Sequence, residues 1–302
     1  MNVHLFGAIS SPSCSNYALR KTADDFEEKE SAEVANVLRK NFYVDDCLRS
    51  EKSEELATDT INGVTRMCTR GGFRLTKFTS NKHCVLEAIP EEERSKELKC
   101  LDLNCDRLPI ERALGVQWFV ESDELGFKII LKDKPLTRRG ILATISSIYD
   151  PIGMAAPILL SGKRILQDLC REKLTWDDDL PQEYRARWEK WRTELPALEQ
   201  FVLARCLKPS NFGTPVIKQI HSFSDASLMG LGQVSYLRQV NDKGDIHCAF
   251  LMGKARLTPL KAITIPRLEL TAALLSAKLE PSLKLNWDYR IKKPIGRTTQ
   301  PL

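Results

Sequence analysis

The sequence lacks any long hydrophobic run, and none of its apolar stretches is long enough to cross a bilayer. It has nine cysteines but no Cys-x-x-Cys pair, so neither a zinc knuckle nor a disulfide framework is predicted. No basic segment followed by an apolar one opens the chain, which excludes a typical secretory signal. We therefore expect an intracellular protein, cytoplasmic or nuclear, that is not secreted and has no membrane partner.

A strong excess of one charge is also missing. The 45 Lys and Arg residues stand against 40 Asp and Glu, a net charge of +5 that permits nucleic acid as a partner without requiring it. The chain nevertheless has 302 residues, 42% of them hydrophobic, which is enough for about two domains with real cores.

Three patterned stretches and a tail divide the chain. Residues 1–130 mix helical spacing with short strand signals, among them Phe73–Phe78, and residues 131–210 are mainly helical, with Trp188 and Trp191 on a face expected to be core. Residues 211–280 predict three consecutive strands and then a helix that opens at Pro266. Residues 281–302 are basic and have little periodicity. The fold class is therefore α+β.

Two adjacent carboxylates, Asp45 and Asp46, interrupt an aromatic and β-branched run and predict a hairpin with the aspartates at its turn. An Asp-rich turn is common for conformational reasons alone. Paired carboxylates are also what a two-metal phosphoryl-transfer site uses to hold divalent cations.

The surrounding motifs favour the second interpretation. Tyr43-Val44-Asp45-Asp46 resembles the YxDD box of reverse transcriptases, and further matches follow in that family's order: Phe6-Gly7 with Ser11-Pro12, Gly72–Lys77, and the primer-grip-like Leu114-Gly115-Val116-Gln117-Trp118. The resemblance implies that Asp45 and Asp46 bind the catalytic metal. It also implies that Tyr43, Val44, Gly115 and Trp118 contact the primer-template.

The residues of several motifs are similar to those of BEL/Pao-type LTR retrotransposon Pol polyproteins. These motifs are Phe6-Gly7-Ala8, Ser10–Ser13, Tyr149-Asp150-Pro151-Ile152-Gly153 and Trp176-Asp177. The resemblance covers roughly residues 1–280. It implies a partial palm over 1–130, a helical thumb and connection over 131–210, and the β-β-β-α N-terminal half of a ribonuclease H-like domain over 211–280.

The ribonuclease H resemblance rests on an Asp at the end of the first strand and a Glu on the following helix. Asp225 and Glu269 occupy these places, and Gly230 and Gly232 match the family's small residues. The resemblance implies that both carboxylates hold Mg²⁺ or Mn²⁺, for which they should converge on one side of the sheet.

Both implied sites lack a carboxylate. The first palm Asp would precede Met1, and the Thr-Asp-Ser box of ribonuclease H is absent. We therefore expect a Pol fragment that is inactive alone, with the missing Pol segments or a second chain needed for turnover.

Two alternatives stay open. One is a non-catalytic remnant that binds nucleic acid. The other is an aspartic peptidase, because this region of the family is often labelled a Pao retrotransposon peptidase. An aspartic peptidase needs Asp-Thr-Gly or Asp-Ser-Gly, and the sequence contains neither.

Overall fold

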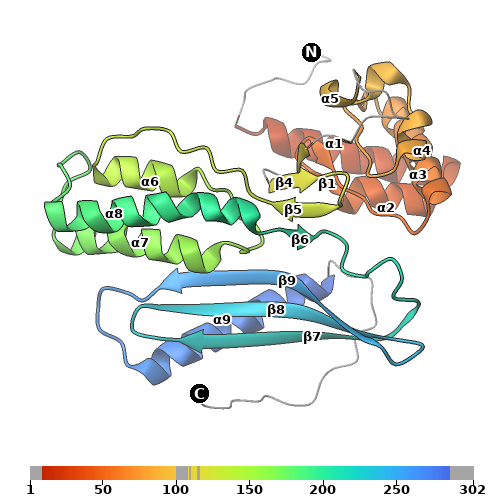
Figure 1. Ribbon diagram of the computed structural model, residues 1–302. Helices are drawn as coiled ribbons and strands as arrows, with labels where there is room; N and C mark the ends of the chain where they lie inside the picture. The colour runs from red at the N-terminus through yellow and green to blue at the C-terminus, as the bar shows by residue number, and fades with distance from the viewer. Residues whose placement is uncertain (1–8, 100–107, 109, 114–115, 286–302) are drawn as a thin grey trace. The chain divides into compact units, whose positions relative to one another are not determined.

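The computed structural model describes residues 9–99, 108, 110–113 and 116–285, to which every structural statement refers (Figure 1). The chain divides into two compact units, residues 1–123 and 124–302. Both contain helices and strands, so the α+β class is confirmed. No helix in the described part of the chain is long and apolar enough to cross a membrane.

Three helices form the first core of the N-terminal unit: α1 (Ser11–Phe26), α2 (Ala32–Lys40) and α3 (Glu54–Arg70). Ser31 and Ser53 cap α2 and α3 by accepting backbone N–H bonds, which fixes where these helices begin. The core between the helices includes Leu38 and Met67, which are both fully buried. A short 3-10 helix, η1 (Glu27–Lys29), separates α1 from α2, and the hairpin β1 (Phe42–Tyr43) and β2 (Asp46–Cys47) separates α2 from α3.

A second, smaller core lies in the later part of this unit and includes Leu86, Leu98 and Val120. The strand predicted over Phe73–Phe78 is wrong, because only Phe78 forms a bridge, to Arg94. The apolar side chains of that segment pack against helices. Their burial, without strand pairing, explains why apolar and polar residues alternate there. The elements here are α4 (His83–Glu87), η2 (Glu91–Glu93), α5 (Lys96–Lys99), β3 (Ile110–Ala113) and β4 (Val116–Phe119).

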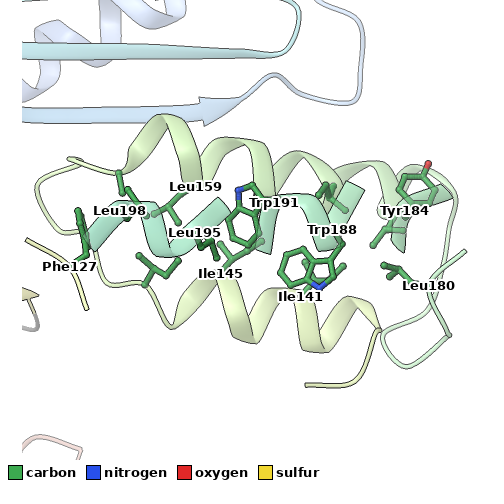
Figure 2. Packing of buried hydrophobic residues seen from close by; sticks show 14 residues of the cluster. Phe127, Ile141, Ile145, Leu159, Leu180, Tyr184, Trp188, Trp191, Leu195 and Leu198 are labelled. Atoms are coloured by element: carbon green, nitrogen blue, oxygen red, sulfur yellow. The ribbon is translucent and has the colours of Figure 1, made fainter. Parts of the chain in front are cut away.

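The C-terminal unit begins with a layer of three helices. Trp188 and Trp191 are buried between them, which confirms the prediction that this face is core (Figure 2). Their rings stack with centroids 5.0 Å apart, and the Trp191 indole N–H donates to the Ile158 carbonyl at 2.9 Å. The elements are β5 (Glu124–Gly126), α6 (Arg138–Ser146), α7 (Ala156–Arg171), α8 (Gln182–Glu194), η3 (Leu195–Gln200) and β6 (Leu203–Ala204).

Asp150, in the loop between α6 and α7, organises the start of α7. Its carboxylate accepts backbone N–H bonds from Gly153, Met154 and Ala155 at 2.8–2.9 Å. The same loop joins the helical layer to the sheet, because Gly253 on β9 donates its backbone N–H to the Ile152 carbonyl at 2.8 Å.

Three long antiparallel strands follow: β7 (Pro215–Ala226), β8 (Gly230–Asn241) and β9 (Ile246–Leu257), with β8 in the centre. Helix α9 (Ile265–Leu285) runs along one face of them (Figure 1). This β-β-β-α order is the predicted one. The helix continues past residue 280, where we expected the basic tail to begin, because Leu283 is buried against the sheet.

Candidate nucleic-acid site

The predicted hairpin forms as β1 and β2, with Asp45 in its turn and Asp46 as the first residue of β2. Tyr43 pairs with Asp46, so Val44 and Asp45 form the two-residue turn. Both aspartates are exposed, as is the Tyr43 ring. Asn41 closes the base of the hairpin by donating its side-chain N–H to the Leu48 carbonyl at 2.7 Å. The turn can therefore present two carboxylates to an external ligand.

Val44 has an unusual backbone conformation at this turn. Its φ of 54° lies in the left-handed region, where a β-branched side chain is disfavoured and glycine is usual. The Val44 side chain is half exposed, so little burial offsets the cost. Strain of this kind is kept where a turn must hold a particular shape.

Of the two residues predicted for the primer grip, the structure describes Trp118 and not Gly115. Trp118 is on β4 and is half buried, with its indole N–H donating to the Asp123 carboxylate at 3.0 Å. Its ring packs against the second core of the unit, so it supports the fold around β4.

Asp225 is the next-to-last residue of β7 and is exposed. It pairs with Gly232 on β8, where an added Cβ would meet the Lys254 carbonyl oxygen at 3.5 Å, an ordinary contact. Gly230, two residues earlier, has a steric reason to be glycine, because a Cβ there would lie 2.8 Å from Leu160 of α7.

Glu269 is exposed in the first turns of α9, directly after the buried Leu268. Leu268 packs against Leu231 and Ala226 at the same end of the sheet as Asp225. The two candidate carboxylates therefore come from neighbouring elements at one end of the domain.

The alternation of side chains along β7 places the side chains of Asp225 and Glu269 on different sides of the sheet. Ala226 and its partner Leu231 belong to the cluster that contacts α9, so they define the sheet face that the helix covers. Because neighbouring residues of a strand point to opposite faces, Asp225 is directed to the face that α9 does not cover. Glu269 is on the helix side, and the structure does not bring the two carboxylates together on one face.

A divalent cation needs several oxygen ligands arranged around one point. Among the described residues, no three His, Cys, Asp or Glu side chains gather in a way that could hold a metal ion. Neither the Asp45–Asp46 turn nor Asp225 with Glu269 supplies such a set by itself. These carboxylates therefore do not fit a complete two-metal site within the described part of the chain.

The sequence reasoning missed an aromatic row on the face of Asp225. Phe223, Tyr236 and Phe250 come from three adjacent strands, with ring centroids 6.4 and 6.0 Å apart and edge-to-face geometry. Tyr236 pairs with Phe250, which carries the row across the sheet. The period of two within each strand puts an aromatic on this face, but the row itself depends on strand register, which a single strand does not specify.

The comparisons with known proteins agree with the topology of the C-terminal unit. A search of the curated proteins finds no match. Residues 137–296, slightly more than half of the chain, match the family described as Pao retrotransposon-like RNaseH-like domain. The match begins at the N-cap of α6 and so includes the helical layer together with the β-β-β-α segment. The description names a ribonuclease H-like domain and no peptidase. The chain therefore belongs to the Pao retrotransposon-like RNaseH-like domain family.

Proposed function

We propose that the chain is a fragment of a retrotransposon Pol protein whose ribonuclease H-like unit binds RNA/DNA duplex without cleaving it when alone. The match over residues 137–296 carries this proposal, because its matched segment includes the whole β7–β8–β9–α9 unit. The family relation supports a nucleic-acid-related role. The incomplete carboxylate sets support binding over turnover.

Asp225 and Glu269 are the residues we assign to the ribonuclease function of the parent protein, with Mg²⁺ or Mn²⁺ as the cofactor. Their common position at one end of the domain supports the assignment. Their placement on opposite sides of the sheet supports an inactive state, as does the finding that no group of three potential metal ligands forms among the residues that the structure describes. Completion would require ligands from the missing Pol segments or a second chain, together with a rearrangement that brings Asp225 and Glu269 to one metal.

For the N-terminal unit we propose the palm of an RNA-directed DNA polymerase, with Asp45 and Asp46 as metal ligands and Tyr43 and Val44 under the primer. The left-handed Val44 supports this assignment, because a strained turn that displays two carboxylates suggests selection for something other than stability. Gly115 and Trp118 remain proposed members of the primer grip.

The test is a comparison of binding and turnover on one substrate. A fluorescein-labelled RNA/DNA hybrid is titrated with the chain and followed by anisotropy, and the same mixture is examined for cleavage with Mg²⁺, Mn²⁺ or EDTA. We expect binding that weakens with salt, because phosphate contacts release counterions, and no cleavage under any condition. The controls D225N and E269Q should bind the hybrid at least as tightly as the parent chain, since each removes one negative charge.

Three results would change the proposal. Metal-dependent cleavage that is lost in both D225N and E269Q would make the chain an active ribonuclease. Extension of a primed RNA template that is lost in D45N would make it an active polymerase. No binding of the hybrid at low salt would remove the nucleic-acid function.

A further inference from the structure

The turn between β7 and β8 exposes two large apolar side chains. Leu228 is 67% exposed and Met229 64% exposed, and they are the two residues at the tip. Leu260, in the segment that follows β9, is 51% exposed. Apolar side chains concentrated at a tip are a common sign of an interaction surface.

Hydrogen bonds on both sides hold the tip in one conformation. The Ser227 hydroxyl accepts the backbone N–H bonds of Met229 and Gly230 at 3.2 and 3.3 Å. The Thr258 hydroxyl donates to the Leu228 carbonyl at 2.7 Å, and Gln167 of α7 donates to the Thr258 carbonyl at 2.7 Å. A braced tip loses little conformational entropy when it binds a partner.

Basic residues lie around this end of the sheet. Arg256 of β9 pairs with Leu231 of β8, which lies two residues after Met229. Lys254 lies two residues before Arg256 on the same strand. Lys261 and Arg267 follow in the segment that leads into α9, and all four cations are exposed. Residues 225–231 and 254–269, which contribute this end of β7, β8, β9 and α9, contain these four cations and two carboxylates, Asp225 and Glu269.

We propose that Leu228 and Met229 form an apolar wedge that inserts at a base step of an RNA/DNA duplex, with Lys254, Arg256, Lys261 and Arg267 on the flanking phosphates. The apolar tip is complementary to the stacked bases of a duplex. The cations on either side of it are complementary to the negatively charged phosphates. The wedge lies three residues after Asp225 and would fix where the duplex lies relative to that carboxylate. The inference rests on the proposed function and adds to it the element that positions the substrate.

The experiment uses the full chain and an RNA/DNA hybrid with one 2-aminopurine in the DNA strand. The double variant L228S/M229S removes the wedge at exposed positions, away from the buried core. The matched control V216S/I246S removes two equally exposed apolar side chains from the opposite end of the same sheet, where exposure is 62% and 59%. Circular dichroism and thermal melting check that both variants keep the fold.

We expect L228S/M229S to weaken hybrid binding about tenfold, since two apolar side chains lose their contact with the bases. The slope of log Kd against log salt should not change, because no charge is removed. The rise in 2-aminopurine fluorescence that reports an unstacked step should be lost. The variant R256Q should instead lower the salt slope by about one, as expected for a phosphate contact. V216S/I246S should bind like the parent chain.

The binding measurements distinguish a wrong wedge from a wrong proposed function. If the parent chain binds the hybrid and L228S/M229S binds it equally well, the wedge is wrong and the nucleic-acid function stands. The wedge is also wrong if V216S/I246S weakens binding as much as L228S/M229S. If the parent chain does not bind the hybrid, the proposed function is wrong and the wedge with it.

Discussion

The backbone of Gly153 lies directly against the backbone of Gly253. A Cβ atom at Gly153 would fall 1.9 Å from the Gly253 carbonyl oxygen, and a Cβ at Gly253 would fall 2.9 Å from the Gly153 carbonyl oxygen. Gly153 also has φ of 82°, which favours glycine. The loop before α7 and strand β9 can therefore approach closely only because neither residue has a side chain. This contact joins the two layers of the ribonuclease H-like unit.

We expect Gly153→Ala to destabilise the C-terminal unit by about 2–4 kcal/mol, because it adds a backbone clash to an unfavourable φ. The measurement is urea unfolding followed by tryptophan fluorescence. Gly244→Ala is the matched control, since φ there is 89° but no atom lies within 4 Å of the added Cβ. It should cost only about 1 kcal/mol. Equal losses in the two variants would show that the close approach to β9 does not matter.

Asp150 gives a second prediction about the same loop. Its carboxylate accepts three backbone N–H bonds, so Asp150→Ala leaves three donors without their partner, and we expect a loss of about 3 kcal/mol. Asp133→Ala is the control, because the Asp133 side chain is fully exposed and forms only a surface ion pair with Arg192. That change should cost less than about 1 kcal/mol. Hydrogen exchange should show faster opening at the start of α7 in Asp150→Ala, and unchanged exchange there would contradict the role of Asp150.

The order of the C-terminal elements could be predicted from sequence because each strand and helix there has its own local periodicity. Strand β7 is longer than the predicted segment Val216–Phe223, since Ser224 and Asp225 continue it to Ala226. Contacts between distant segments could not be predicted in this way. Glu124 pairs with Ala204 across 80 residues, and nothing in either segment indicates the other.

The positions of the candidate site residues could also be predicted only in part from the sequence. Sequence reasoning could place Asp225 on a strand and Glu269 on a helix. The side of the sheet that each carboxylate occupies follows from which strand residues contact α9. Packing of Ala226, Leu231 and Leu268 determines which face of the sheet α9 covers. The spacing of the acidic residues in the sequence does not indicate that face.

Val44→Gly should raise the stability of the N-terminal unit by about 1 kcal/mol. Glycine adopts φ of 54° without the penalty that a β-branched residue carries, and relief of that penalty exceeds the entropy cost of glycine. Val216→Gly is the control, because Val216 is similarly exposed but lies in the extended strand β7. It should lower stability by about 1 kcal/mol. Chemical denaturation measures both, and destabilisation by Val44→Gly would show that the turn is not strained.

Cys68 gives a prediction on pH. Burial in the first core raises the pKa of its thiol to about 12, from an ordinary value of 9.0. The unfolded chain therefore loses this proton at lower pH than the folded chain, and stability falls as pH rises from about 9 to about 12. Cys68→Ala should remove this part of the pH dependence, which is measured as the difference between the two unfolding curves across that range.

Alkylation tests the same thiol directly. At pH 8 iodoacetamide should modify the exposed Cys14 rapidly and Cys68 only when the unit unfolds, because the thiolate is the reactive form and burial suppresses it. Mass spectrometry of tryptic peptides distinguishes the two sites, and urea should bring their rates together. Equal labelling of Cys14 and Cys68 in the folded chain would contradict the burial of Cys68 between α1, α2 and α3.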